Sequence, residues 1–466
     1  MKRNIIKCLS FACLTILAIV MTYSVLSWKD TSGSYISVTE QLYKTDKNLI
    51  DVAFVGSSHV YTSIYPAYLW EGYGISAFDM SLSEQDKFTS YYCLKELLKT
   101  QRPRVVCLEM YGLTFEGHND IGDEYRNMLA LKTSLNALEL AKNGYATQDY
   151  LDYLLRWPIV HTRYRELGKY DFANNEINDY SRGAIMGWGL RQAGYMNPDI
   201  VKIKEYTELS PENQAWLDSF VDLSNEYGFD LVLFLAPDFQ SENQKKITNG
   251  AREYAKEKGI DFIDFTELAA SIGFDPTYDM GDLLHCNADG AYKISGYFGD
   301  YLAKNYDLQD HRGDKKYYQW DKDCELLEQI VQENEIYLAA EDEDYLDILS
   351  DSKNLTVVLS LDGEFEGCID FMAKFGIPFE ECLDGGKWIY RNGQAQKIMS
   401  NNPGEVHIID LNKYDSVKLQ CGAEGTDTKS NILFGLDQEM SSENGLNVFV
   451  YDDVRKKAVS KRGMSY

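Results

Sequence analysis

Residues that could carry out chemistry stand at two places far apart in the chain. Ser57 and Ser58 directly follow the apolar stretch 51–55, and Asp282 and His285 stand just before a predicted helix. A serine hydroxyl becomes a nucleophile when a histidine takes its proton, and a carboxylate can hold that histidine in the required orientation. Together these residue types form the set needed to cleave or transfer an acyl ester.

Each of the two motifs is weak alone and more specific in combination. Serine is common at helix N-caps and turns, so a Gly-Ser-Ser turn also has an ordinary structural interpretation. In the second motif, Asp282 can hold one ring nitrogen of His285 while the other nitrogen faces a serine. Either Ser58 or Ser57 could be that serine. His59 is a less suitable base, because adjacent residues at a helix start do not face one another.

The elements around these motifs read as short apolar strands that alternate with helical patterns. Such alternation is typical of a parallel sheet with helices on both faces. The predicted strands cover residues 51–55, 74–82, 102–112, 229–237 and 260–265. Gly56 permits a sharp turn after the first strand. Ser58 then lies at the carboxyl end of a strand, where ligands of open α/β sheets bind.

The N-terminus predicts a membrane segment over residues 1–30. Lys2, Arg3 and Lys7 precede an uncharged apolar run at 8–26 that is long enough to cross a bilayer. The basic flank keeps the N-terminus in the cytoplasm and places the bulk of the chain outside the cell. A cleaved signal peptide is the alternative, although the following residues form a poor cleavage site.

Composition and organisation narrow the function further. The net charge of −27 and the absence of a basic stripe argue against nucleic acid as a partner. No Cys-x-x-Cys or His-rich pair suggests a metal site.

We expect four segments along the chain. They are the anchor, a catalytic domain over 45–308 with a helical insertion at about 118–208, a linker at 309–324, and a second domain over 325–466.

From about residue 50 to 308 the chain resembles the SGNH (GDSL-like) hydrolase family. The first family block, Gly-Asp-Ser, matches Gly56-Ser57-Ser58, and the last block, Asp-x-x-His, matches Asp282 and His285. The resemblance implies a flavodoxin-like three-layer α/β fold without cofactor or metal. It also implies that Ser58 is the nucleophile, His285 the base and Asp282 the residue that orients the base.

The second family block, Asn-x-x-x-x-Gly, lies over residues 79–84. Glu84 stands where the family has a glycine whose N–H stabilises the oxyanion. We expect backbone N–H groups of Ser58 and of Ser83 or Glu84 to take this role, although Glu tolerates fewer backbone angles than Gly.

The third family block, Gly-x-Asn-Asp, is matched letter for letter by residues 117–120, which include Asn119. In the family this block directly ends a strand, whereas the predicted strand here ends several residues earlier. We therefore expect Glu109 or Tyr111 to face the pocket, with Asn119 as the weaker candidate. A carboxylate is a poor oxyanion donor, so Glu109 would orient backbone or substrate groups.

The variant blocks look most similar to membrane-anchored SGNH proteins of bacterial envelopes, including relatives of teichoic acid D-alanylation and polysaccharide O-acetylation proteins. This resemblance implies acyl transfer to, or hydrolysis from, a cell-surface glycan or teichoic-acid-like polymer, with a membrane-bound O-acyltransferase as a partner. Arginines 156, 163 and 165 form either a solvated helix face or a basic lip for such a polymer.

The segment 325–466 is similar to an ILEI-type domain, mainly in its closing stretch Gly-Leu-Asn-Val-Phe-Val-Tyr-Asp. This resemblance implies a compact α/β sandwich with either a recognition role or a structural one. For the whole chain, the rival to an enzyme is a non-catalytic glycan-binding or assembly scaffold that keeps the SGNH fold.

Overall fold

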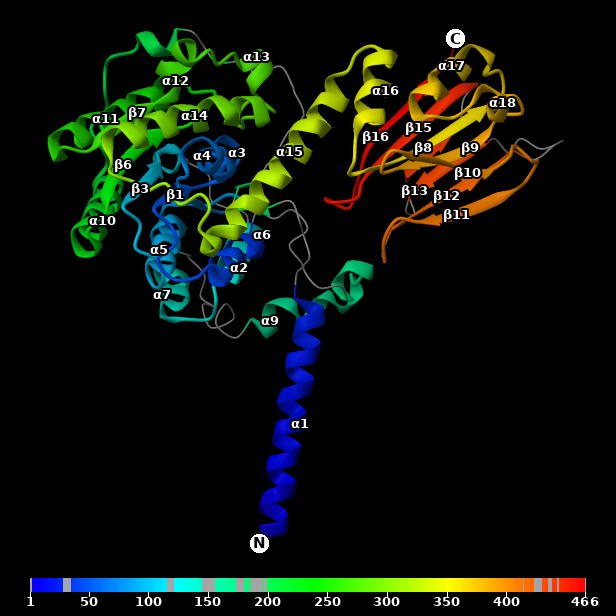
Figure 1. Ribbon diagram of the computed structural model, residues 1–466. Coiled ribbons are helices and arrows are strands. Elements are labelled where there is room, and N and C mark those ends of the chain that lie inside the picture. The colour runs from blue at the N-terminus through cyan, green and yellow to red at the C-terminus, as the bar shows by residue number, and fades with distance from the viewer. Residues whose placement is uncertain are drawn as a thin grey trace. The chain divides into compact units, whose positions relative to one another are not determined.

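The computed structural model describes most of the chain as two compact units, Met1–Glu325 and Leu326–Tyr466 (Figure 1). The described residues are 2–27, 35–114, 121–144, 156–172, 180–182, 184–185, 196, 199–413, 415–422, 430–434, 438–441 and 444–465.

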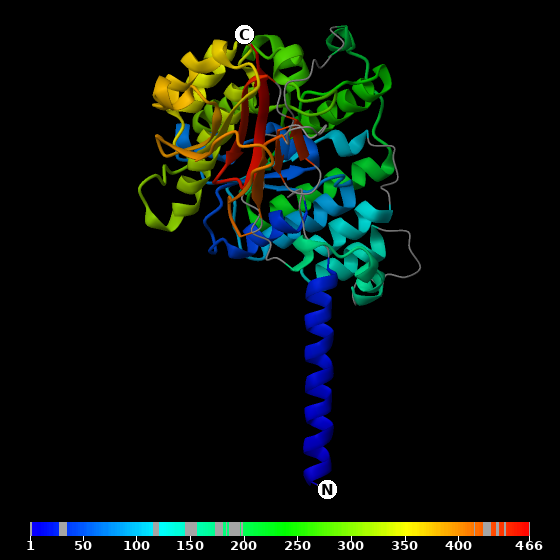
Figure 2. The ribbon, with the colours of Figure 1, turned by 90° about the vertical axis from the view of Figure 1, so that its right-hand side faces the viewer.

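The first unit is built on a five-stranded parallel sheet with the strand order β2-β1-β3-β6-β7 (Figures 1 and 2). This is the flavodoxin-like order, so the predicted fold class is confirmed. The strands are short and almost wholly buried, because helices cover both faces. Their bounds are β1 (Val52–Gly56), β2 (Ala77–Ser81), β3 (Val105–Glu109), β6 (Asp230–Leu235) and β7 (Asp261–Asp264).

Alternate side chains of each strand enter two separate cores. Val55 of β1 packs in the core under α5 and α10, whereas Phe54 packs in the core under α3 and α14. The helices and 3-10 segments of this layer are α2 (Ile36–Lys44), α3 (Ser58–Ser63), α4 (Pro66–Tyr73), α5 (Lys87–Leu98), η1 (Tyr111–Leu113), α10 (Pro211–Tyr227), α11 (Glu242–Lys258), α12 (Phe265–Leu268), η5 (Ala269–Ile272), α13 (Pro276–Asp279) and α14 (Ala288–Asn305).

Local sequence signals set the ends of these helices. α10 begins at Pro211, its N-cap Ser210 accepts the N–H of Asn213, and Gly228 ends it in the left-handed region with φ 79°. Gly259 ends α11 in the same way with φ 71°.

The predicted insertion at about 118–208 contains several short elements in its described parts. They are α6 (Ile121–Ala130), α7 (Leu135–Asn143), α9 (Trp157–Val160), η2 (His161–Arg165), η3 (Lys169–Phe172), β4 (Tyr180–Ser181), β5 (Ala184–Ile185) and η4 (Ile200–Lys202). The segment expected as a linker, 309–324, contains η6 (Lys315–Tyr317) and the start of α15 (Tyr318–Leu338). Trp320 is fully buried there and donates its ring N–H to the carbonyl of Ala77 at 2.9 Å.

The second unit places helices on one face of an antiparallel sheet and a second sheet on the other. In β8 and β15, Val357 and Val448 pack toward the helices, while Val358 and Phe449 pack toward the second sheet. The sheet orders are β10-β9-β8-β15-β16 and β11-β12-β13-β14. The elements are α16 (Asp342–Asp351), β8 (Leu355–Asp362), η7 (Glu366–Cys368), α17 (Ile369–Met372), η8 (Ala373–Phe375), α18 (Phe379–Cys382), β9 (Gly386–Arg391), β10 (Gln394–Met399), β11 (Val406–Asp410), β12 (Ser416–Gln420), β13 (Asn431–Phe434), β14 (Gln438–Ser441), β15 (Gly445–Asp452) and β16 (Lys457–Met464).

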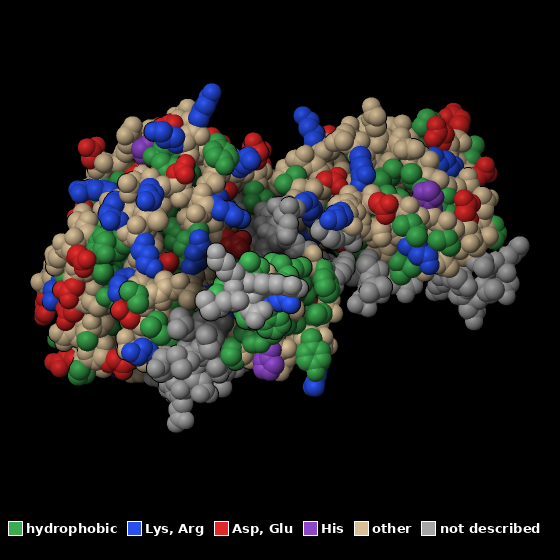
Figure 3. Space-filling model, turned by 90° about the horizontal axis from the view of Figure 1, so that it is seen from below, with side chains coloured by type: hydrophobic (Ala, Val, Ile, Leu, Met, Phe, Trp, Pro, Cys, Tyr) green, Lys and Arg blue, Asp and Glu red, His purple; other side chains and the backbone are tan. Residues whose placement is uncertain are grey.

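The N-terminal helix α1 (Lys2–Leu26) is long and apolar. Its span Ile5–Leu26 has a mean hydropathy of 2.3, and its most apolar stretch is not buried against the rest of the protein. No other helix among the described residues is long and apolar enough to cross a membrane. Figure 3 shows its hydrophobic side chains exposed on the face seen from below. The helix is therefore a membrane anchor or a signal sequence.

Candidate active site

Strand β1 delivers Ser58 to the carboxyl edge of the sheet. β1 ends at Gly56, Ser57 is the N-cap of α3, and Ser58 is the first residue of that helix. Gly56 is not in a positive-φ conformation, so the turn that it permits does not itself require a glycine. A side chain at this position would instead lie 2.7 Å from both Cβ of Glu109 and a methyl group of Val60. Glycine is required here because β3 and α3 approach closely.

A tight loop between α13 and α14 carries Asp282 and His285. One carboxylate oxygen of Asp282 accepts the backbone N–H groups of Leu284 at 2.7 Å and His285 at 2.8 Å, which closes the loop. The loop is anchored at its far end by Asn287, whose side chain caps α14 by accepting the N–H groups of Asp289 and Gly290. The local sequence thus fixes the direction of His285.

The fold brings Ser58, His285 and Asp282 together. His285 Nε2 lies 2.8 Å from Ser58 Oγ, and His285 Nδ1 lies 2.8 Å from Asp282 Oδ2. Partial burial disfavours the Asp282 carboxylate, but hydrogen bonds from the His285 ring and from the loop N–H groups outweigh it and lower the pKa of Asp282. An ionised Asp282 can hold His285 in the tautomer that takes a proton from Ser58.

A small cavity of about 30 Å³ opens directly onto these residues. It is lined by Ser57, Ser58, His59, Glu84, Gln85, Tyr111, Leu284 and His285. Ser57 Oγ is buried and has no hydrogen-bond partner among the described residues. Both serines line the cavity, but only Ser58 contacts His285.

The turn that follows β2 brings Glu84 to the cavity. Glu84 adopts a left-handed conformation with φ 51°, which a glycine would adopt without strain. Gln85 is buried and holds this turn, because its side-chain carbonyl accepts the N–H of Leu82 at 3.0 Å. Ser83 does not line the cavity. Of the two predicted backbone donors near this turn, the structure thus brings only Glu84 to the site.

The end of β3 places Glu109 and Tyr111 differently. Tyr111 lines the cavity, whereas the buried Glu109 carboxyl accepts the Tyr111 N–H at 2.9 Å and lies 3.5 Å from the Ala236 N–H. Burial, aided by the nearby Asp238, raises the pKa of Glu109 to about 8. The Glu109 side chain therefore orients backbone, and Asn119 lies outside the described residues.

Sequence reasoning gave no pocket role to His59 or to Tyr61. His59 lines the cavity and stacks on Tyr111, with ring centroids 4.0 Å apart and an interplanar angle of 20°. Burial raises the pKa of the Tyr61 phenol, and its hydrogen bonds with Ser83 and Ser58 oppose only part of this rise. Their positions follow from the first turns of α3, and a wheel of that helix would have placed Ser58 and Tyr61 on neighbouring faces.

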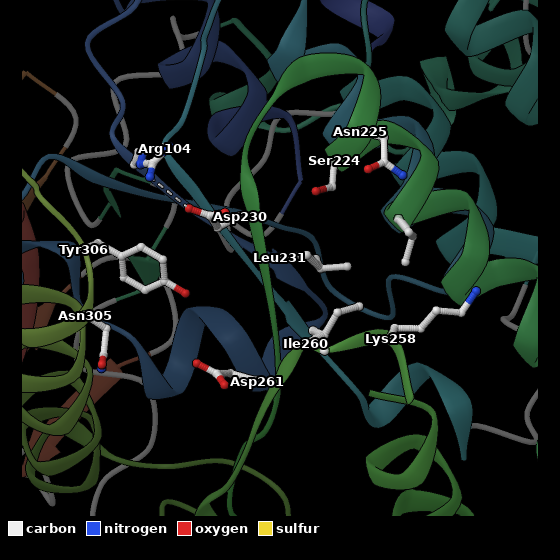
Figure 4. A pocket seen from close by; sticks show the side chains of 12 residues that line it. Arg104, Ser224, Asn225, Asp230, Leu231, Lys258, Ile260, Asp261, Asn305 and Tyr306 are labelled. Carbon is white, nitrogen blue, oxygen red and sulfur yellow. Dashed lines mark ion pairs between the residues drawn. The ribbon is translucent and has the colours of Figure 1, made fainter. Parts of the chain in front are cut away.

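A larger cavity of about 400 Å³ lies at the opposite edge of the sheet, where β6 and β7 begin (Figure 4). Arg104 and Asp230 form an ion pair across part of it at 3.3 Å. Its lining contains neither histidine nor cysteine. The serine in this lining, Ser224, donates its hydroxyl to the Phe229 carbonyl at 2.6 Å, whereas Ser58 contacts a histidine, so the smaller cavity at Ser58 is the candidate active site.

Of arginines 156, 163 and 165, the first two are engaged within the fold, whereas Arg165 is exposed and donates to the Tyr164 hydroxyl at 3.0 Å. Arg163 is buried, donates to the carbonyl of Leu26 at 2.7 Å and pairs with Asp171 at 2.9 Å. Arg156 donates to the carbonyls of Leu129 and Leu131. Within the described part of the chain, no group of three or more His, Cys, Asp or Glu side chains could hold a metal ion.

Comparison with known proteins assigns the chain to no family. The chain matches no protein-family model and no curated protein. Among solved structures, it is similar to a candidate acylhydrolase from Bacteroides fragilis, with 13 % identity, a TM-score of 0.29, and coverage of 60 % of this chain and 98 % of the other. It is also similar to an acetyl xylan esterase from the rumen bacterium Butyrivibrio proteoclasticus, with 11 % identity, a TM-score of 0.24, and coverage of 55 % and 64 %.

The first of these solved structures is named as an acylhydrolase and the second as an acetyl xylan esterase. At such low identity and TM-score, neither assigns a substrate to this chain. The resemblances to envelope acyltransferase relatives and to an ILEI-type domain receive no support from them and stay predictions. The functional assignment therefore depends on the geometry around Ser58.

Proposed function

We propose that this protein is a membrane-anchored serine esterase or O-acyltransferase that acts on acyl groups of a cell-surface glycan or teichoic-acid-like polymer. The observation that carries the proposal is the position of His285, which contacts Ser58 Oγ with one ring nitrogen and Asp282 with the other, each at 2.8 Å. A Ser-His-Asp arrangement of this kind is the machinery of acyl transfer.

In the proposed reaction, Ser58 Oγ forms a bond to the acyl carbon while its proton moves to His285 Nε2. The carbonyl π electrons move to the oxygen, and Asp282 stabilises the imidazolium. Collapse of this intermediate breaks the bond to the leaving oxygen, which receives the proton from His285. The acyl-Ser58 then passes its acyl group to water, giving hydrolysis, or to a glycan hydroxyl, giving transfer.

The dimensions of the cavity support a short acyl group. A cavity needs roughly 10–15 Å³ measured in this way to hold one water molecule, and the cavity at Ser58 measures about 30 Å³. This space suits an acetyl-sized group better than a long acyl chain. The glycan itself would bind outside the cavity.

The contacts of α1 support an anchor that is not removed. The carbonyl of Leu26, at the end of α1, accepts a hydrogen bond from the buried Arg163. Cleavage after α1 would leave this guanidinium with one partner fewer, which is costly for a buried charge. An anchored enzyme would meet polymers at the cell surface.

We also propose a membrane-bound O-acyltransferase as the partner that supplies the acyl group. This part of the proposal rests on the resemblance alone.

The test compares the full chain in detergent with three serine variants, using a fluorophosphonate probe and p-nitrophenyl acetate. We expect wild-type protein to be labelled and to hydrolyse the ester, and Ser58→Ala to lose both activities. Ser63→Ala is the matched control, because Ser63 is a buried serine on the same helix that does not line the cavity. Ser57→Ala tests the alternative nucleophile.

The outcomes separate the enzyme from the scaffold. Loss of labelling in Ser57→Ala but not in Ser58→Ala would assign the nucleophile to Ser57. Wild-type protein that is neither labelled nor active, like Ser58→Ala, would support a non-catalytic scaffold. Addition of a polyol acceptor measures transfer, because a transferase would form the acyl-polyol at the expense of free acid.

A further inference from the structure

His59 combines features that ordinary packing does not explain. Its side chain is only 1 % exposed, and its Nδ1 is buried without a hydrogen-bond partner among the described residues. Burial of an unpartnered polar nitrogen costs free energy, because the group loses its hydrogen bonds to water. Native proteins satisfy most such groups, and those that remain unsatisfied call for an explanation such as a catalytic role.

The position of His59 gives that explanation, because its ring lines the cavity at Ser58. Tyr111 stacks on one face of the ring at 4.0 Å, and the ring centroid lies 5.4 Å from that of His285. Since His285 directly contacts Ser58 Oγ, the imidazole of His59 borders the space where an acyl carbonyl must lie during attack. Stacking holds the ring in place without using either nitrogen.

Two other polar side chains around the cavity are already engaged, whereas the Ser57 hydroxyl, like His59 Nδ1, has no hydrogen-bond partner among the described residues. Both Nε2 hydrogens of Gln85 have acceptors, in the carbonyl of Met80 and the hydroxyl of Ser90. The ring nitrogens of His285 contact Ser58 and Asp282. An oxyanion gains most from donors that are already in place and have no other acceptor to give up.

We infer that the His59 imidazole donates its N–H to the acyl oxygen as negative charge develops there. This inference rests on the proposed function and adds a side-chain donor to the backbone N–H groups already predicted. In the step itself, Ser58 Oγ bonds to the acyl carbon, its proton moves to His285, and the carbonyl electron pair moves to the oxygen that accepts the His59 N–H. The hydrogen bond is released when the carbonyl re-forms.

The electrostatic environment agrees with this role. Burial, and then repulsion by His285, lower the pKa of His59 to about 3. His59 is therefore a neutral imidazole, which carries one N–H. A neutral donor does not oppose the positive charge that His285 gains in the intermediate, whereas a second cation so close to it would.

The experiment measures p-nitrophenyl acetate hydrolysis by the full chain with His59→Phe, His59→Gln and His59→Asn. Phenylalanine keeps an aromatic ring against Tyr111 but has no N–H. We expect His59→Phe to lower kcat about 10²–10³-fold with little change in KM, as for loss of one oxyanion donor. His59→Gln places an amide near the Nε2 position and His59→Asn near Nδ1, so partial recovery in one of them identifies the donating nitrogen.

His311→Phe is the matched control, because His311 also stacks on a tyrosine, Tyr317, at 4.3 Å and does not line the cavity. Its kcat should equal that of wild type. Thermal unfolding and end-point labelling of Ser58 correct each kcat for the folded, active fraction. Because His59→Phe removes a buried unpartnered nitrogen, we expect its unfolding temperature to be equal to or above that of wild type.

Three outcomes are decisive. If wild type is active and His59→Phe keeps kcat within threefold, His59 is a packing residue and the inference is wrong. If Tyr111→Phe loses kcat and His59→Phe does not, the donor is the phenol and the inference is equally wrong. If wild type is neither active nor labelled, the proposed function itself fails, which is distinguishable from both other results.

Discussion

At the scale of single residues, the candidate site shows which departures from the family pattern matter. His285 lies within hydrogen-bonding distance of both Ser58 and Asp282, although Ser57 stands where the SGNH family that the sequence resembles has an aspartate. At the second block, Glu84 adopts φ 51°, the conformation for which a glycine is normally used. The backbone therefore keeps a glycine-like geometry that the side chain disfavours. Such strain is often found at functional sites.

This strain predicts the effect of Glu84→Gly. A non-glycine residue in the left-handed region costs about 1–2 kcal/mol, which a glycine would not pay. Glycine also makes the unfolded chain more flexible, and this cancels part of the gain in stability. We expect Glu84→Gly to raise the free energy of unfolding by up to about 1 kcal/mol relative to Glu84→Ala, which keeps the Cβ. Urea unfolding of both variants measures this difference. Equal stability of the two would show that the turn is not strained.

At the scale of elements, the carboxyl groups buried in the sheet make stability depend on pH. Asp79 lies in β2, is fully buried, and has no hydrogen-bond partner for either carboxylate oxygen among the described residues. Burial raises its pKa well above the ordinary value. Burial also raises the pKa of Glu109 to about 8 and that of Asp238 to about 7. The folded state thus holds protons that the unfolded state releases.

The sign of the effect follows from these raised pKa values. Between the unfolded pKa of about 4 and the folded pKa, the folded state binds more protons, so stability falls as pH rises by up to about 1.4 kcal/mol per pH unit for each group. We expect Asp79→Asn to raise the unfolding temperature at pH 8 and to change it little at pH 4. Calorimetry at both values measures this.

Asp222→Asn is the control, because Asp222 is an exposed carboxylate on α10. Its replacement should change the unfolding temperature equally at the two pH values. If Asp79→Asn behaves like Asp222→Asn, then the Asp79 carboxylate has a partner in solution and its pKa is not raised.

At the scale of the whole molecule, the first unit carries both the candidate site and α1. The sheet of this unit positions Ser58, while the end of α1 is held by the buried Arg163. The second unit has its own two-sheet core, so its function must be tested separately. The proposed enzyme is thus a catalytic unit attached directly to its anchor.

The anchor can be tested in a bacterial host that expresses the full chain. We expect the intact chain, with its N-terminus retained, to stay in the membrane pellet after alkaline carbonate extraction. Leu14 and Leu17 are exposed apolar residues of α1. A charged residue at the centre of a span costs about 2.5–3.5 kcal/mol, so Leu14→Lys with Leu17→Lys should release the chain. A wild-type chain lacking residues 1–26 in mass spectrometry would show a cleaved signal peptide.

Local patterns predicted the strands of the first unit and, together with the resemblance to SGNH hydrolases, the three site residues. The short apolar strands, the N-terminal Pro211 and the terminal Gly228 of one helix act through neighbours in the chain, so they are readable without a structure. The Asp-x-x-His spacing is equally local, because Asp282 closes the loop that contains His285. The position after a strand indicated both Ser57 and Ser58, and only the resemblance to the first SGNH block favoured Ser58.

Only the tertiary structure decided how these parts meet. The strand order puts β1 beside β3, which explains Gly56 by its distance to Glu109 rather than by a turn. It also stacks His59 on Tyr111 and leaves the Asp79 carboxylate without a hydrogen-bond partner among the described residues. Each of these facts depends on contacts between residues that are distant in the sequence. Packing and desolvation act through space, so no local pattern of residues carries that information.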